Sequence, residues 1–178
     1  MMFPRTGWTL LLLVFWTAGA LEAPAQEVEI DTVPLASVRF LDREITLDVV
    51  SGMAQGLVSC EVGVNLDRVD LVASLDTPLP EGVRLLVRGE SGLGPSLGSR
   101  ELSGREDGRV TLVSSLARGH ETGCLLTLTV LVEPGFDVLP LRRTLILSLY
   151  DPVAGSWAEA RQTLLLGSPG AVASPGRR

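Results

Sequence analysis

Hydrophobic and polar residues alternate with a period of two along most of the chain beyond residue 35, a pattern typical of β-strands that are buried on one face. The alternation predicts about nine strands. Their expected ranges are 36–40, 45–49, 58–66, 69–75, 83–88, 109–112, 126–132, 144–149 and 157–166. The last range alternates less cleanly, and a short helix over residues 158–165 is the alternative there.

Strands with one apolar and one polar face are typical of antiparallel sheets that are packed on one side. Two such sheets facing each other form a sandwich. Turn-forming residues separate the expected strands. They stand at Asp67-Arg68, Pro78–Gly82, Asp107-Gly108, Pro134-Gly135 and Asp151–Gly155. The sequence therefore predicts an all-β fold, an antiparallel two-sheet β-sandwich.

The N-terminus has the parts of a secretory signal peptide. Arg5 supplies the positive charge, and the apolar run over residues 8–18 is shorter than the roughly 20 residues of a spanning helix. Small residues at Ala23-Pro24-Ala25 offer a cleavage site. We expect cleavage after Ala25 and a secreted, periplasmic or extracellular protein that does not span a membrane; an uncleaved anchor is the alternative.

These features divide the chain of 178 residues into a signal peptide over 1–25, a sandwich domain over 26–167 and a disordered tail over 168–178. Residues 89–108 interrupt the strand pattern with six glycines, four serines and one proline in 20 positions. Loops of that length are often functional. The alternative is a flexible excursion between two strands.

The two cysteines are the most specific feature of the sequence. Cys60 and Cys124 each alternate in step with the apolar residues of their strands, so both are expected to point into the core. In an exported chain such a pair predicts one disulfide. It would pin two strands from inside, and a link between opposing sheets is one arrangement that meets this condition. Two free buried thiols are the alternative.

An inward-facing cysteine pair 64 residues apart resembles the arrangement in immunoglobulin domains. The strand after Cys60 has no tryptophan, however, and residue 122 is threonine where those domains place a tyrosine. The resemblance therefore implies an immunoglobulin-like architecture without membership of the family.

Charge and composition exclude several functions. A net charge of −6, from 15 basic and 21 acidic residues, argues against nucleic-acid binding, which needs a basic face. All basic residues are arginines, so lysine-based catalysis is excluded. With His120 as the single histidine, no histidine-only metal cluster can form in one chain. The sequence implies no cofactor.

The remaining candidate sites are weak. His120-Glu121 is the one candidate metal pair, and an exposed acid beside a single histidine is usually solvated. The glycine-rich run 89–94 leads into a proline instead of the helix that a phosphate site needs, so we expect neither metal nor phosphate binding. Tyr150 and Trp157 flank a turn and could form a binding rim; the alternative is that they cover one end of the sandwich.

These observations favour a non-catalytic structural or binding module with a protein or cell-envelope partner, working through strand edges and the 89–108 loop. One alternative is an assembling surface subunit. Residues 27–33 alternate like a strand and could insert into a neighbouring subunit, a plan that resembles subunits of chaperone-assembled fimbriae. The other alternative is a small secreted hydrolase with paired carboxylates.

Overall fold

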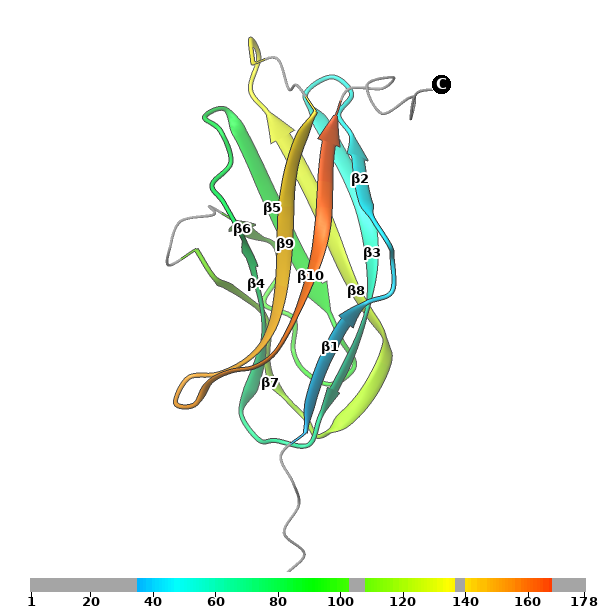
Figure 1. Ribbon diagram of the computed structural model, residues 1–178, viewed down its shortest axis with the longest axis vertical. Helices are drawn as coiled ribbons and strands as arrows, with labels where there is room; N and C mark the ends of the chain where they lie inside the picture. The colour runs from blue at the N-terminus through cyan, green and yellow to red at the C-terminus, as the bar shows by residue number, and fades with distance from the viewer. Residues whose placement is uncertain (1–34, 103–107, 137–139, 168–178) are drawn as a thin grey trace, which may run out of the picture. The chain divides into compact units, whose positions relative to one another are not determined.

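A computed structural model of the chain describes residues 35–102, 108–136 and 140–167. They form ten strands in two facing sheets, and the predicted all-β sandwich is confirmed (Figure 1). The strands are β1 (Ala36–Phe40), β2 (Ile45–Asp48), β3 (Met53–Val64), β4 (Val69–Leu75), β5 (Val83–Glu90), β6 (Arg100–Leu102), β7 (Val110–Leu116), β8 (Gly119–Val132), β9 (Leu141–Asp151) and β10 (Gly155–Gly167). The region expected to be either strand or helix, 158–165, lies within β10.

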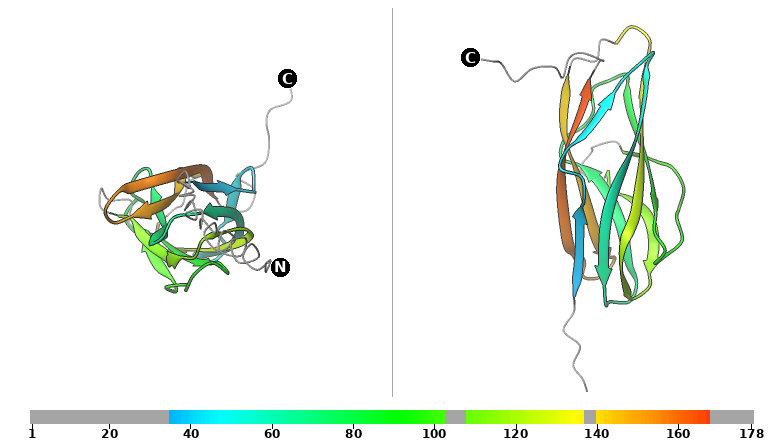
Figure 2. Two further views of the ribbon diagram at one scale, coloured as in Figure 1. Left: turned by 90° about the horizontal axis from the view of Figure 1, so that it is seen from below. Right: turned by 90° about the vertical axis from the view of Figure 1, so that its right-hand side faces the viewer.

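Each sheet contains five strands, in the orders β1-β3-β8-β5-β6 (sheet A) and β2-β10-β9-β4-β7 (sheet B). Nearly all neighbours are antiparallel, as predicted, but β2 runs parallel to β10. This exception arises because the chain changes sheet at residues 41–44: β1 ends against β3 in sheet A, and β2 continues in the same direction along sheet B (Figure 2).

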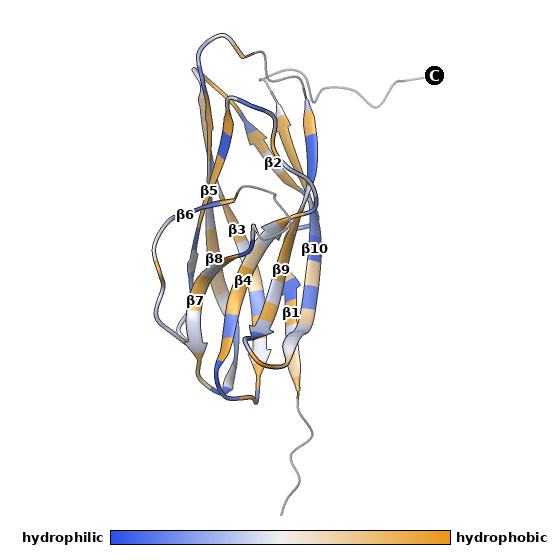
Figure 3. Cartoon of the chain, turned by 90° about the vertical axis from the view of Figure 1, so that its left-hand side faces the viewer, coloured by the Kyte–Doolittle hydropathy of each residue, from blue (hydrophilic) through white to orange (hydrophobic). Residues whose placement is uncertain are grey.

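The core lies between the sheets and is formed by the alternate apolar positions of the strands (Figure 3). Leu126, Leu128 and Val130 on β8 face Leu145, Leu147 and Leu149 on β9, and all six are fully buried. The period-two pattern is therefore explained by burial of one face of each strand. Valine and leucine make up most of this core, and residues such as Ala36, Phe40 and Leu93 pack around it.

The predicted disulfide is present. Cys60 and Cys124 are both fully buried and directly opposite each other on β3 and β8, with 5.0 Å between their Cα atoms. The bridge therefore joins neighbouring strands of one sheet. A link between opposing sheets, the arrangement of immunoglobulin domains, is wrong for this chain. The reason is topological: β3 and β8 pair along nearly their whole lengths, and the sequence pattern could not reveal which strands are neighbours.

Residues 89–108 were expected to be a loop, and part of this expectation is wrong. Glu90 ends β5, β6 adds a short strand to sheet A, and Leu102 is almost fully buried. Between them, Leu97 donates a backbone hydrogen bond to Leu112 on β7, and Ala117 donates one to Leu93. The described part of this segment thus connects both sheets; residues 103–107 lie outside the described part.

Some predictions concern residues that the structure does not describe. The signal peptide over 1–25, the strand-like arm over 27–33 and the tail over 168–178 all lie outside the described residues. They stay predictions. Within the described ranges, the structure contains no helix that is long and apolar enough to cross a membrane.

Candidate functional site

One side of β3 is covered by β1 for only half its length. The pairs run from Ala36 opposite Val64 to Phe40 opposite Cys60. Next, the Leu41 amide donates to the Ser59 carbonyl, and the Asp42 carboxylate accepts a 2.8 Å hydrogen bond from the Ser59 amide. The chain then leaves sheet A for β2. Among the described residues, no strand pairs with this side of β3 from Met53 to Val58.

The free part of β3 presents backbone groups for pairing. Ser59 and Asn65 both form hydrogen bonds on the β1 side, at Leu41 and Leu35. Backbone groups alternate from one side of a strand to the other, so the odd-numbered residues face this side. The amide and carbonyl groups of Gln55 and Leu57 therefore point along the open edge. A Ser51-Gly52 turn with positive φ at both residues starts β3 and holds Met53 against Val50.

Exposed apolar side chains surround this open edge. Leu57 is 70% exposed, Met53 55%, Leu41 46% and Leu125 39%. Leu125 pairs with Ser59, so it lies diagonally from Leu57 across β3 and β8. We call these four residues, together with the amide and carbonyl groups of Gln55 and Leu57, the β3 edge site; the Met53 backbone is already paired with Val50. It combines hydrogen-bonding groups with apolar surface on the same strand.

The inner side of the β3 edge site is closed by β2. A Cβ atom added to Gly56 would lie 2.4 Å from Leu47 Cδ2, so the glycine is needed where β2 crosses. Small residues at 54 and 56 also explain why the sequence pattern placed the start of this strand at residue 58. The alternation is present but Ala54 and Gly56 make it weak, and the Ser51-Gly52 turn was the missed signal.

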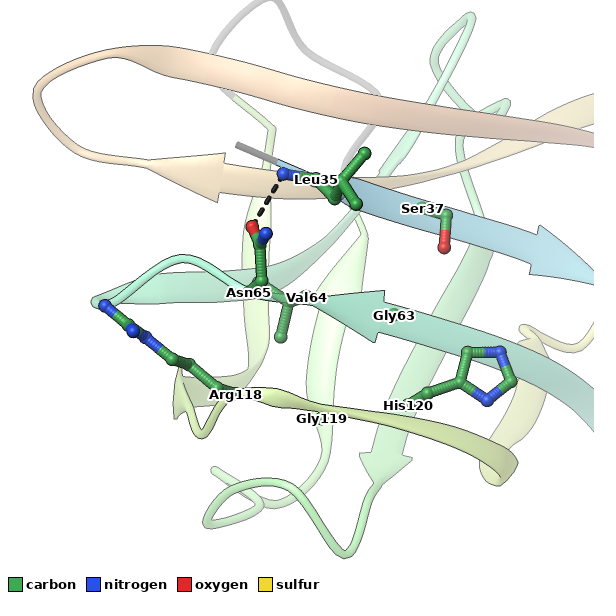
Figure 4. A pocket seen from close by; sticks show the side chains of 9 residues that line it. Leu35, Ser37, Gly63, Val64, Asn65, Arg118, Gly119 and His120 are labelled. Atoms are coloured by element: carbon green, nitrogen blue, oxygen red, sulfur yellow. Dashed lines mark hydrogen bonds between the residues drawn. The ribbon is translucent and has the colours of Figure 1, made fainter. Parts of the chain in front are cut away.

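A groove of about 650 Å³ lies at the other end of β3, between the ends of β1, β3 and β8 (Figure 4). Leu35, Ala36 and Val64 supply apolar surface. The charged side chains at its rim already have partners within the fold: Arg118 makes a double hydrogen bond to Asp67, and His120 binds Glu61. The groove is therefore a weaker candidate for a ligand than the β3 edge site.

Glu61, on the outer face of sheet A, accepts hydrogen bonds from two side chains of neighbouring strands. Its side chain is 12% exposed and accepts hydrogen bonds from His120 Nε2 at 2.9 Å and from Arg39 Nε at 2.7 Å. The hydrogen bond from His120, followed by that from Arg39, lowers the pKa of Glu61 below its ordinary value of 4.5. The carboxylate is thus held in its ionised form, beside the point where β1 leaves the sheet.

The lowered pKa of Glu61 predicts a pH dependence of stability. A group with a lowered pKa in the folded state stabilises the fold above its unfolded pKa and loses that contribution as the pH falls through the folded pKa. Between about pH 6 and about pH 3, the free energy of unfolding should fall further for the wild type than for Glu61→Gln. Urea unfolding at both pH values measures this. Glu81→Gln, at an exposed turn position, is the control and should behave like the wild type.

The other sequence-predicted candidates are Tyr150 and Trp157, which lie near each other on the β9–β10 hairpin because Tyr150 is opposite Ser156, and the pair His120 and Glu121. Tyr150 is half-buried and lies under the Arg109 guanidinium, 5.4 Å from its ring centre, whereas Trp157 is 42% exposed at a bulge in β10. Their role as a binding rim stays a prediction. His120 and Glu121 turn to different partners, because Glu121 accepts hydrogen bonds from Ser91 and from the Gly92 amide.

Within the described ranges, no three histidine, cysteine, aspartate or glutamate side chains are grouped as metal ligands would be. Glu121 instead fixes the turn that begins at Ser91, and so holds the start of the 91–102 segment against β8.

Comparisons with known proteins add the following. No family model matches the sequence, and no curated protein is detectably similar to it. The N-terminal domain of PorA is 8% identical over 76% of this chain and 90% of that domain, with a TM-score of 0.42. The CooA pilin subunit from enterotoxigenic Escherichia coli is 10% identical over 72% of this chain and 95% of the subunit, with a TM-score of 0.35. At these values the similarity concerns strand arrangement and carries no argument about function.

Proposed function

We propose that this chain is an exported, non-catalytic binding module of the cell surface or periplasm that accepts an extended protein segment as an added strand at the β3 edge site. The observation that carries the proposal is the open edge itself: between Met53, which pairs with Val50, and Ser59, which pairs with Leu41, no strand pairs with the outward-pointing backbone groups of Gln55 and Leu57, and exposed apolar side chains surround them. Addition of a strand to an exposed sheet edge is a common mode of peptide recognition.

The composition of the open edge supports this function. Natural proteins usually protect exposed edges with charged residues, proline or a covering element, because such edges pair with other chains. The free part of β3 reads Met-Ala-Gln-Gly-Leu-Val, without a charge or a proline. By contrast, the free part of β10 carries Glu159 and Arg161, and the end of β5 carries Arg88 and Glu90. The β3 edge lacks charge and proline, and β2 crosses its inner side without pairing with the backbone groups of Gln55 and Leu57, which are therefore suited to pairing.

The acids of the fold favour binding over hydrolysis. A hydrolase with paired carboxylates needs one acid with a raised pKa to donate a proton. In the described part of the chain, the carboxyl groups with a shifted pKa are shifted downward. Hydrogen bonds from His120 and Arg39 lower the pKa of Glu61. At Asp76, burial raises the pKa, but hydrogen bonds from Thr144 and Thr77 together outweigh it and leave the pKa lowered. The hydrogen bond from Arg84 lowers the pKa of Glu101.

The disulfide supports the proposed location. Cys60 and Cys124 are bridged and fully buried, and such structural disulfides persist in the periplasm and outside the cell, whereas the cytosol keeps thiols reduced.

Selection of displayed random peptides against the folded protein tests this function. The selected peptides should bind with alternating apolar residues, and Gln55→Pro should weaken their binding about tenfold or more, because proline removes the Gln55 amide donor and places its ring on the edge. Proline is tolerated where a strand amide faces outward, so the fold should survive.

Gln55→Thr is the matched control, because it retains the amide and suits a strand. Peptides that bind Gln55→Thr like the wild type and fail on Gln55→Pro would support the β3 edge site. Peptides that bind all three proteins equally, or a protein that selects no peptide at all, would contradict it.

A further inference from the structure

We propose that the strand accepted at the β3 edge site is residues 27–33 of a second copy of this chain. This inference rests on the function proposed above and names its partner. The segment reads Glu-Val-Glu-Ile-Asp-Thr-Val, and only Pro34 separates it from Leu35, where the described sandwich begins. It is seven residues long, enough to pair along the open stretch of β3 between Met53, which is bonded to Val50, and Ser59, which is bonded to Leu41.

The arm of the same chain cannot pair with this edge. Leu35 is tied to Asn65: the Leu35 amide donates to Asn65 Oδ1 at 2.6 Å, and the Asn65 amide donates to the Leu35 carbonyl at 3.0 Å. Along β3, Gln55 lies ten residues from Asn65, about 33 Å away. Glu27 precedes Leu35 by eight residues, which span at most about 29 Å when fully extended. The whole arm therefore falls short of Gln55, and β1 already occupies the edge in between.

A second copy has no such restriction, and the two ends of the interaction lie apart on each copy. In Figure 1, β1 starts at the bottom of the sandwich, whereas the turn that leads into β3 lies at the top. Leu35, where the described chain begins, and the acceptor edge are thus at opposite ends of β3. An interface between two different surfaces of identical chains is heterologous, and it forms rings or open filaments. The expected assembly is head-to-tail.

The alternation of the arm suits an added edge strand. One face of such a strand continues the outer face of sheet A and the other faces the space between the sheets. Val28 and Ile30 share one face with Thr32, and we assign this face to the inner side, toward β2. The acidic residues 27, 29 and 31 then lie on the outer face, where their charges stay in contact with water and pay no desolvation penalty.

Trans-complementation between two variants of the exported protein tests this inference. The donor variant carries Val28→Asp and Ile30→Asp and keeps its edge. The acceptor variant carries Leu57→Glu, a change at a side chain that is 70% exposed and therefore not needed for folding, and keeps its arm. The added carboxylate repels the acidic arm. Light scattering behind size exclusion measures the mass of each variant, of their mixture and of the wild type.

We expect the wild type to form oligomers, each variant alone to be monomeric, and the mixture to form dimers that do not grow, because only one competent interface exists per pair. Glu27→Gln with Glu29→Gln is the control for the arm and should assemble like the wild type. Gln55→Pro serves as a second acceptor variant, and circular dichroism verifies that every variant contains the native strands.

A monomeric wild type, a mixture that stays monomeric although both variants are folded, or oligomers that persist in both variants would overturn the inference. The peptide selection described above separates this failure from that of the proposed function. If selected peptides still require Gln55, the edge binds another protein; if they do not, both the partner and the site are wrong.

Discussion

Removal of the Cys60–Cys124 disulfide is expected to lower the free energy of unfolding by about 4 kcal/mol, the chain-entropy value for a closed loop of roughly 65 residues. The bridge joins two strands that already pair from Met53 opposite Leu131 to Val64 opposite Gly119, with one register shift between Cys60 and Val62. It therefore adds little order to the folded sandwich and acts mainly by restricting the unfolded chain. Urea unfolding of Cys60→Ala/Cys124→Ala against the wild type measures the loss.

Two effects contribute to this loss and can be separated. Both cysteines are fully buried, so alanine also leaves a small cavity beside Val58 and Leu126. Wild-type protein that is reduced in denaturant and refolded under reducing conditions keeps both sulfur atoms and loses only the cross-link. Its stability should lie between that of the oxidised wild type and that of the double alanine variant. Equal stability of the oxidised and reduced wild type would contradict the argument.

Truncation of Leu102 to alanine is expected to cost about 2–5 kcal/mol, the usual range for a buried leucine. Leu102 ends β6, is 1% exposed and pairs with Leu85 of β5. It is the point at which the 91–102 segment enters the core, so its loss should destabilise the whole sandwich. Thermal and urea unfolding of Leu102→Ala measure the effect.

Leu97→Ala is the matched control in the same segment. Leu97 is 38% exposed, and its tie to β7 is a backbone hydrogen bond that alanine retains. Its truncation should cost clearly less than that of Leu102. If both truncations lowered the free energy of unfolding by the same small amount, the segment would be a flexible excursion between two strands, the alternative that its glycine-rich composition suggested.

The two proposals and the disulfide meet on one strand. In chain order, Cys60 is the first residue of β3 that pairs with β1, and the open edge lies on the N-terminal side of Cys60. The cross-link ties β3 to β8 at the boundary between its covered and free parts. A strand that pairs on one side only would otherwise be held there by a single ladder of hydrogen bonds.

Local patterning predicted much of this protein. Alternation at positions such as Leu126, Leu128 and Val130 identified strands and the faces that they bury, because a period of two follows from strand geometry alone. The same rule placed Cys60 and Cys124 in the core and so predicted their disulfide. Turn residues such as Gly82, Gly135 and Gly155, all with positive φ, marked strand ends, because turn chemistry is local as well.

The alternation and the turn residues thus predicted the all-β sandwich, the buried faces of the expected strands and the disulfide pair. They could not predict that the bridge lies within sheet A, that β2 pairs in parallel with β10, that residues 100–102 form a strand, or that β3 has an open edge. These features depend on which segments become neighbours. Neighbours are chosen by packing between residues far apart in the chain, and the pattern within a single strand carries no record of that choice.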